Sequence, residues 1–207
     1  EPEVDYLLAL ANRYFSRDLT RRDVAWTFAG LRPLLADPAD RATSVTRDYV
    51  LDLEATGAPL LSVYGGKLTT YRKLAEDVVD SLAPRLDCKA PPWTAGRPLP
   101  GGDMPGADFE AFHAALARGH PWLPAKLLQR WARAYGTRIE RLIGSATSPA
   151  GLGEEVLPGL YAREIDYLRR EEWAVTAEDM LYRRSKLALH LPADAAARLD
   201  DWLARHP

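Results

Sequence analysis

The stretch LLSVYGGKLTTY, residues 60–71, combines a strand, a glycine turn and the start of a helix. Its first five residues form a short apolar run that is typical of a strand covered on both faces. Gly65 and Gly66 allow backbone angles and close approaches that a side chain would block. After two threonines, apolar residues at helical spacing predict a helix to Leu82. Because outward N–H groups and a helix dipole accompany Lys67, we expect this turn to face an electron-rich group.

The residues before this turn predict one helix and further strands. Apolar residues at helical spacing predict an amphipathic helix over residues 2–15, with its apolar side packed in a core. The segments VAWTFAGL (24–31) and TRDYVLDL (46–53) have strand character, and residues 54–59 form a hairpin-type loop. The first part of the chain is therefore expected to be α/β.

Arg32 closes the first of these predicted strands. Pro33 biases Arg32 to an extended backbone and denies the strand a ladder N–H. One interpretation is an arginine at a strand end whose guanidinium reaches water. The other is an anion clamp, because a guanidinium offers a planar fork suited to phosphate or carboxylate. The residue by itself does not decide between them.

The second half of the chain is predicted to be helical. Proline and glycine crowd into a semi-rigid linker at residues 89–106, which separates a domain at 1–88 from a helical domain at 107–207. We expect no strand in the helical domain, and we interpret its aromatic residues as core. The expected helices span residues 109–117, 123–135, 138–143, 160–173, 177–189 and 193–204.

Composition restricts the class of protein. The chain has 207 residues, is 47% hydrophobic and 27% charged, and carries a net charge of −2, which argues against nucleic-acid binding through bulk charge. Its single cysteine, Cys88, excludes an internal disulfide and fits a reducing compartment. No apolar run approaches the roughly 18 residues of a membrane span.

Motifs of other catalytic classes are not found in the sequence. The four histidines are scattered without the spacing of a metal site, and no nucleophile elbow, G-x-G-x-x-G fingerprint or P-loop occurs. Spacing alone thus supports a mixed α/β module with an anion site, joined to a helical module. We predict no metal.

Several segments together resemble one family. WTFAGLRPL (26–34), TRDYVLDL, PLLSVYGGKLTTYRKLAE (59–76) and LPGGD (99–103) resemble the carboxy-terminal part of FAD-dependent aerobic glycerol-3-phosphate dehydrogenases. The segment EEWAVTAEDMLYRRSK (171–186) fits the helical tail of that family, so the resemblance covers essentially the whole chain. It implies an α+β, mostly helical fold in which part of a flavin and substrate domain precedes an all-α C-terminal domain.

The resemblance also implies a reaction and roles for residues. Such an enzyme oxidises sn-glycerol 3-phosphate to dihydroxyacetone phosphate, passes a hydride to FAD, and delivers the electrons to a membrane quinone. Arg32 would bind the substrate phosphate, and Lys67 would lie in the same pocket as a substrate-binding and catalytic charge. The cofactor-binding residues would be Gly65, Gly66, Lys67, Leu68 and Thr69. The expected location is cytoplasmic, peripherally associated with the inner membrane.

Two alternatives remain open. A glycerol-3-phosphate oxidase, which passes electrons to oxygen, would carry the same Arg32 and Lys67. A protein of a different class would use the helical half as a non-catalytic interaction module. That half lacks an extended basic amphipathic face, which favours a packed bundle over a helix lying on a membrane surface.

The chain is expected to be one piece of a longer protein. Its first residue is glutamate, and the family's dinucleotide-binding glycines would lie upstream. We therefore expect that the chain alone neither binds FAD tightly nor turns over substrate. We also expect exposed apolar surface within residues 1–88, which dimerisation would cover.

Overall fold

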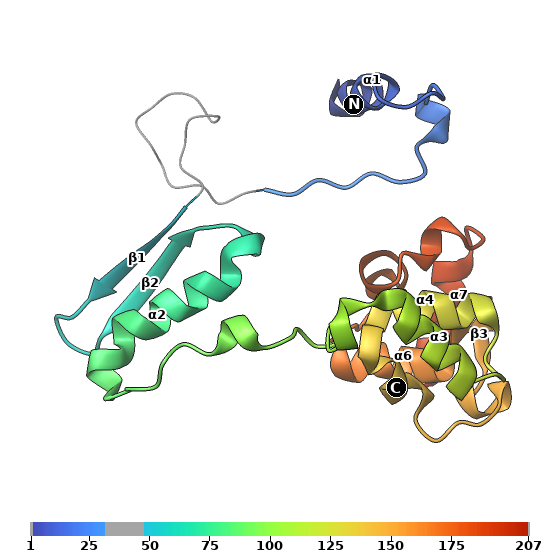
Figure 1. Cartoon of the computed structure of the whole chain (residues 1–207). Coiled ribbons are helices and arrows are strands. Elements are labelled where there is room, and N and C mark those ends of the chain that lie inside the picture. The colour runs from blue at the N-terminus through green and yellow to red at the C-terminus, as the bar shows by residue number, and fades with distance from the viewer. Residues whose placement is uncertain (1, 32–47, 207) are drawn as a thin grey trace. The chain divides into compact units, whose positions relative to one another are not determined.

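The computed structural model describes residues 2–31 and 48–206, which form two compact units. Residues 27–97 make up one, and residues 1–26 together with residues 98–207 make up the other. We refer to them as the hairpin unit and the helical unit (Figure 1). The described residues are mostly helical, with two small two-stranded sheets, which confirms the expected α+β, mostly α fold class.

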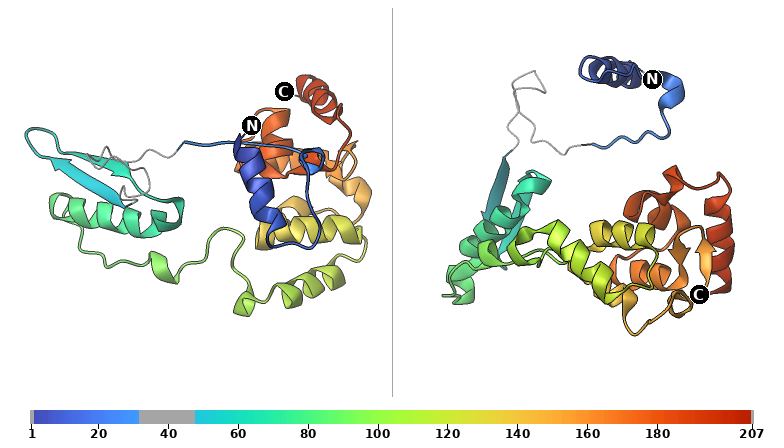
Figure 2. Two further views of the ribbon diagram at one scale, coloured as in Figure 1. Left: turned by 90° about the horizontal axis from the view of Figure 1, so that it is seen from above. Right: turned by 45° about the vertical axis from the view of Figure 1, so that its right-hand side comes forward.

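The hairpin unit consists of an antiparallel hairpin and one long helix. Strand β1 (Tyr49–Glu54) pairs with β2 (Leu60–Gly65), which confirms the hairpin-type loop expected between them. Helix α2 (Tyr71–Leu86) lies along one face of the hairpin in two views (Figures 1 and 2). Short 3₁₀ turns, η2 (Leu68–Thr70) and η3 (Thr94–Gly96), flank this helix in the chain.

The outer face of the hairpin is exposed, contrary to the expected burial of residues 60–64 on both faces. Val50 pairs with Tyr64 on this face, and they are 45% and 47% exposed, respectively. Leu60, at the other end of β2, is 59% exposed. Among the described residues, α2 is the helix that packs on the hairpin, and a single helix covers a single face. The prediction of exposed apolar surface in this part of the chain is confirmed.

The strand expected at residues 24–31 does not form. The backbone there is irregular. Among the described residues no strand pairs with it, so its N–H and C=O groups form no sheet hydrogen bonds. Within the helical unit, Trp26 instead contacts Tyr182, with ring centroids 5.4 Å apart. The Lys186 ammonium lies 4.9 Å from the centroid of the Trp26 ring.

The amino-terminal helix forms, but its apolar side is not buried. Helix α1 (Pro2–Asn12) is followed by a 3₁₀ turn, η1 (Arg21–Asp23). Tyr6 and Leu7 of α1 are 66% and 59% exposed, and the helix contains no buried residue. The expectation that this helix packs in a core is therefore wrong for the described structure.

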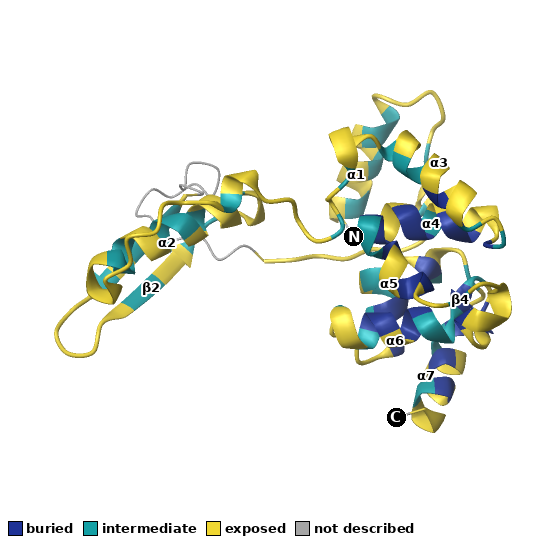
Figure 3. Ribbon diagram, turned by 60° about the horizontal axis from the view of Figure 1, so that its bottom comes forward, coloured by how far each residue is buried: buried dark blue, intermediate teal, exposed yellow. Residues whose placement is uncertain are grey.

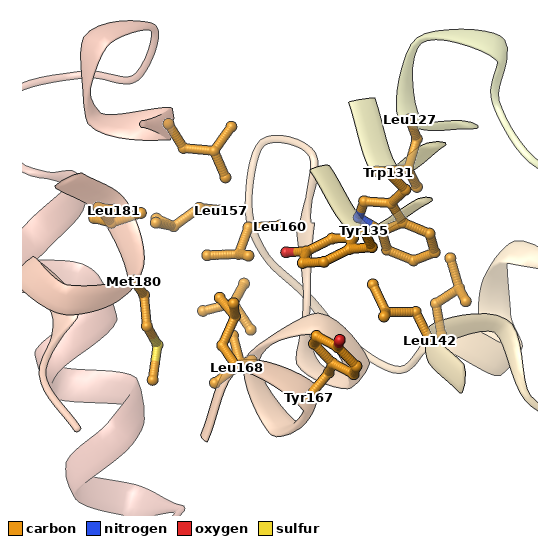
Figure 4. Close-up of a cluster of buried hydrophobic side chains, with 14 of the residues drawn as sticks. Leu127, Trp131, Tyr135, Leu142, Leu157, Leu160, Tyr167, Leu168, Met180 and Leu181 are labelled. Atoms are coloured by element: carbon orange, nitrogen blue, oxygen red, sulfur yellow. The ribbon is translucent and has the colours of Figure 1, made fainter. Parts of the chain in front are cut away.

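The helical unit contains the buried core of the described chain, as the colouring of Figure 3 shows. Trp131, Leu142 and Leu160 are fully buried in it, and Figure 4 shows them among their neighbours. Five α-helices expected in this half are confirmed to within a few residues at each end. They are α3 (Phe109–Gly119), α4 (Ala125–Tyr135), α5 (Ile139–Ile143), α6 (Ala162–Glu171) and α7 (Ala195–Arg205), with the 3₁₀ turns η4 (Pro105–Ala107), η5 (Gly136–Arg138) and η6 (Pro149–Leu152).

A small hairpin corrects the expectation that this unit is entirely helical. Strand β3 (Glu155–Leu157) pairs with β4 (Leu160–Tyr161) across Pro158 and Gly159. Gly159 has φ +75°, which suits the third position of a tight turn after a proline. The Pro-Gly pair was a turn signal, but two and three residues are too few to show a strand period.

The helix expected over residues 177–189 is replaced by two shorter elements. A π-helical segment, η7 (Asp179–Arg184), is followed by a 3₁₀ turn, η8 (Leu187–Leu189). The Ser185 hydroxyl donates to the Met180 carbonyl at 2.6 Å, and Lys186 has φ +59°, which a continuous α-helix does not allow. This local backbone pattern divides the expected helix.

The helical unit is held by a buried ion pair between two of its helices. Glu164 on α6 is fully buried and accepts hydrogen bonds at 2.6 Å from both Nη atoms of Arg130 on α4. The Tyr135 hydroxyl also donates to Glu164 at 2.6 Å, and Arg130 donates to the Gly159 carbonyl at 2.6 Å. Burial first, and then the Glu164 charge, raise the pKa of Tyr135. These bonds tie α4, α6 and the β3–β4 turn together.

The end of the proline-rich segment packs against the helical unit. The Thr137 N–H donates to the Gly101 carbonyl at 3.0 Å. Gly101 and Gly136 have φ +85° and +54°, and a Cβ on Gly136 would overlap the Gly101 carbonyl oxygen. Glycine is therefore required for this close approach, and residues from 98 onward belong to the helical unit.

Candidate functional site

The glycine turn leaves β2 through two residues with positive φ. Gly65 has φ +73° and Gly66 has φ +96°, both of which favour glycine. Lys67 then has an extended backbone, and η2 leads directly into α2. The Thr70 hydroxyl donates to the Lys67 carbonyl at 3.0 Å, which fixes the first turn of this helical segment. The strand, glycine turn and helix expected from the sequence are thus confirmed.

The turn is supported from the neighbouring strand. Tyr49 is the ladder partner of Gly65, and a Cβ on Gly66 would lie 3.5 Å from Tyr49 Cβ. The Tyr49 hydroxyl hydrogen-bonds the Asp77 carboxylate on α2, and Lys73 forms an ion pair with the same carboxylate. These contacts connect the hairpin to α2 immediately beside the turn.

The supporting groups have pKa values that follow from their contacts. The hydrogen bond from Lys73, and then the one from Tyr49, lower the pKa of Asp77. The hydrogen bond to Asp77 raises the pKa of Tyr49 and also that of Lys73. At neutral pH this arrangement keeps Asp77 ionised and Tyr49 protonated, so the hydrogen bond persists.

A second set of contacts attaches η3 to the same helix. Glu76 pairs with Arg72 at 2.9 Å and accepts a hydrogen bond from the Thr94 hydroxyl. Arg72 also donates to the Thr94 hydroxyl oxygen at 3.2 Å. The Thr94 hydrogen bond, followed by the Arg72 charge, lowers the pKa of Glu76. Glu76 and Asp77, which are adjacent on α2, therefore attach η3 and strand β1 to this helix.

Lys67 differs from the basic residues around it. It is exposed, and within residues 2–31 and 48–206 it makes no ion pair, whereas Arg72 and Lys73 both have carboxylate partners. Leu68 and Thr69 are also exposed, and Leu68 is 88% exposed. The turn thus presents an unneutralised ammonium beside the positive end of a helical segment, which is suited to an anionic or electron-rich ligand.

The predicted site residues are only partly brought together by the structure. Gly65, Gly66, Lys67, Leu68 and Thr69 are contiguous at the turn. Arg32 lies outside the described residues, and its joint role with Lys67 stays a prediction. No cluster of three or more histidine, cysteine, aspartate or glutamate side chains suited to a metal occurs in the described parts of the chain.

Tyr49 and Asp77 were not identified by sequence reasoning. Tyr49 lies on the inward side of an alternating strand, where a half-buried tyrosine usually needs a partner for its hydroxyl. Asp77 follows Lys73 by four residues on a helix, a spacing typical of an ion pair. Each signal was present, but only the packing of α2 on the hairpin brings the two residues together.

The chain has a cationic glycine turn between a hairpin and a helix, followed by a mostly helical unit. Residues 92–205 match the model of the C-terminal domain of alpha-glycerophosphate oxidase. Because this match covers more than half of the chain, the chain belongs to that family, and the resemblance stated from the sequence is confirmed.

Curated relatives extend the similarity over the whole chain. The chain is 48% identical to a glycerol-3-phosphate dehydrogenase of Pseudomonas aeruginosa, over 100% of the chain and 41% of that protein. It is 43% identical to the aerobic glycerol-3-phosphate dehydrogenase of Escherichia coli, over 100% of the chain and 41% of that protein. It is also 43% identical to a D-erythritol 1-phosphate dehydrogenase of Brucella abortus, over 98% of the chain and 40% of that protein. The chain spans about two fifths of the length of these relatives.

Proposed function

We propose that the chain provides the phosphate-facing part of the substrate site in an FAD-dependent glycerol-3-phosphate dehydrogenase. The observation that carries this proposal is the exposed ammonium of Lys67, which has no ion-pair partner among the described residues at a glycine turn. The relatives are named for the oxidation of polyol phosphates, and a phosphate dianion is the ligand that such a charge suits.

The geometry of the turn fits the electron-rich edge of a flavin. Positive φ at Gly65 and Gly66 lets the backbone approach a planar ring, and the turn is followed by the exposed residues Leu68 and Thr69. Gly65 to Thr69 would hold FAD, which when bound accepts a hydride from the substrate. Backbone N–H groups and Lys67 would stabilise the negative charge that accompanies this reduction.

Lys67 and Arg32 bind the substrate phosphate in different ways. Lys67 acts as a point charge, while Arg32 offers a planar fork that binds two phosphate oxygens at once. Together they orient the substrate so that its C2–H bond faces the hydride acceptor. Fixing this orientation lowers the activation barrier of hydride transfer, because the translational and rotational entropy of the substrate has already been lost on binding.

The substrate class is a polyol phosphate, and glycerol 3-phosphate is the proposed member. Two of the three relatives described above carry glycerol 3-phosphate in their names, and the third carries D-erythritol 1-phosphate. Both compounds offer the same phosphate to Lys67. Residues that contact the carbon chain must distinguish between them.

The proposed electron acceptor is a membrane quinone, which requires peripheral association with the membrane. Among the described residues, no helix is long and apolar enough to cross a bilayer. The family model is named for an oxidase, so oxygen is the competing acceptor. Dimerisation through the exposed outer face of the hairpin is a further part of the proposal.

A steady-state assay of the full-length protein tests this function. Glycerol 3-phosphate, D-erythritol 1-phosphate and glycerol are compared as substrates, with a quinone analogue or oxygen as acceptor. We expect the highest kcat/KM for glycerol 3-phosphate with the quinone analogue. Equal activity with glycerol would refute phosphate recognition, and faster turnover with oxygen would establish an oxidase.

Replacing Arg32 with alanine is expected to raise KM for glycerol 3-phosphate in the full-length protein. Loss of a charge-assisted hydrogen bond to phosphate corresponds to an increase of about 10- to 100-fold. FAD retention, measured by absorbance after dialysis, should change much less. Unchanged KM and kcat would remove the anion clamp and leave the interpretation of an arginine that reaches water.

The 207-residue chain on its own is expected to retain no FAD after dialysis. It contains no G-x-G-x-x-G fingerprint for the dinucleotide, and its hairpin is exposed on one face. The measurement is the absorbance of the purified chain in the flavin band, together with an assay for oxidation of glycerol 3-phosphate. A flavin spectrum that survives dialysis would contradict this expectation.

A further inference from the structure

A surface pocket in the helical unit lies between α5, the turn η6 and α6. Its volume is about 600 Å³, within the range of small-molecule sites. Its charged lining consists of Arg141, Arg163, Arg170, Asp166 and Glu171. Three arginines converging on one pocket are unusual for a surface that only faces water, because their charges repel one another.

The carboxylates of the pocket do not neutralise these arginines. Glu171 is shared, because it accepts from Arg141 at 2.9 Å and from Arg138, just outside the lining, at 3.2 Å. Asp166 is 3.9 Å from Arg170, at the limit of an ion pair. Three guanidinium groups of the lining therefore face two carboxylates, one of which is shared with Arg138, and the pocket keeps an excess of positive charge.

Arg163 carries most of this excess. It is half-buried on the first turn of α6, and among the described residues it makes no ion pair or hydrogen bond. Its guanidinium lies against Gly144, where a Cβ would overlap it. A half-buried guanidinium without a partner is costly, so its position favours an anionic ligand.

Tyr167 adds a second unmet polar group to the same pocket. It is 5% exposed, lines the pocket, and its hydroxyl has no hydrogen-bond partner among the described residues. The Arg138 guanidinium is near enough to interact with the hydroxyl, but not in hydrogen-bonding geometry. A buried hydroxyl without a partner is rare in a finished core, and a ligand oxygen would satisfy it.

We propose that this pocket binds a phosphate monoester. The forks of Arg141, Arg163 and Arg170 suit the oxygens of a dianion better than a single carboxylate, and the volume leaves room for a small organic group. The first turn of α6 adds the positive end of a helix dipole. The phosphate comes either from a free metabolite or from phosphatidic acid, a membrane lipid whose headgroup is itself a phosphate monoester.

Calorimetric titration of the 207-residue chain with inorganic phosphate tests the proposal at constant ionic strength. Saturable binding at this pocket is expected, and Arg163→Ala should weaken it by about 10- to 100-fold. Arg170→Ala should weaken it as well, and its side chain is 77% exposed, so this second variant is not expected to disturb folding. Far-ultraviolet circular dichroism verifies the fold of each variant.

Matched variants separate this pocket from other cations. Arg198→Ala, an exposed arginine on α7, should leave phosphate binding unchanged. Lys89→Ala, which removes an exposed lysine that pairs with exposed Asp87 at 3.6 Å, should also leave phosphate binding unchanged. The proposal is overturned if the wild-type chain shows no saturable binding, or if folded Arg163→Ala and Arg170→Ala variants bind phosphate as tightly as the wild type.

The source of the phosphate is determined in two parallel arms. One titrates glycerol 3-phosphate, and the other measures co-sedimentation with vesicles that contain phosphatidic acid in phosphatidylcholine, with pure phosphatidylcholine vesicles as the control. Binding lost in Arg170→Ala in the first arm assigns a free metabolite. The same loss in the second arm alone assigns a lipid headgroup, and no loss in either arm contradicts the proposal.

Discussion

Replacing Lys67 with alanine is expected to lower kcat/KM for glycerol 3-phosphate by about 10- to 100-fold in the full-length protein. This range corresponds to the loss of one charge-assisted contact to a dianion. The hairpin unit should remain folded, because Lys67 is exposed and its side chain makes no ion pair within the described chain. Steady-state kinetics with glycerol 3-phosphate as the varied substrate give the effect.

Two further variants identify what Lys67 contributes. Lys67→Arg retains the charge and should recover part of the activity, although its planar fork reaches the phosphate differently. Lys89→Ala removes another exposed lysine of the hairpin unit, which pairs with exposed Asp87 at 3.6 Å, and should have little effect. Equal losses in Lys67→Ala and Lys89→Ala would mean that net charge, and not the glycine turn, determines activity.

Replacing Glu164 with alanine is expected to destabilise the helical unit by about 3–5 kcal/mol. Glu164 is fully buried, and its removal leaves Arg130 and the Tyr135 hydroxyl without their partner. For a domain of this size, such a loss lowers the midpoint of thermal unfolding by more than about 10 °C. Thermal unfolding followed by circular dichroism measures the change.

The loss of charge and the loss of volume at Glu164 are distinguished by a second substitution. Glu164→Gln keeps the size of the side chain but removes its charge, and should still be clearly destabilising because Arg130 stays partly buried. Glu110→Ala, an exposed position on α3 in the same unit, should change stability by less than about 1 kcal/mol. Similar midpoints for Glu164→Ala and Glu110→Ala would contradict a stabilising role for the buried pair.

Local patterns predicted the elements whose formation depends on nearby residues. The turn at Gly65 and Gly66 was readable because few residues other than glycine adopt positive φ, and the helix after it showed a clear period. The alternation in β1 was equally local. These elements place Lys67 at an exposed turn, and its role in a site stays a prediction.

Features that depend on partners far away in the sequence were not predictable. The segment at residues 24–31 has strand composition, but a strand forms only where another strand supplies its ladder. The fully buried Glu164 looked like any helix-surface glutamate, because its partners Arg130 and Tyr135 are 34 and 29 residues away. The pocket around Arg163 likewise depends on how α5 and α6 pack.

If the glycine turn recognises phosphate, the preference of the enzyme for glycerol 3-phosphate over glycerol depends on Lys67. Single-turnover flavin reduction is measured with glycerol 3-phosphate and with glycerol, in the wild-type full-length protein and in Lys67→Ala. If Lys67 contacts the phosphate, the preference for glycerol 3-phosphate over glycerol falls by about tenfold or more in the variant, because only one substrate loses a contact. An unchanged preference, with both rates lowered equally, would contradict recognition of the phosphate by Lys67.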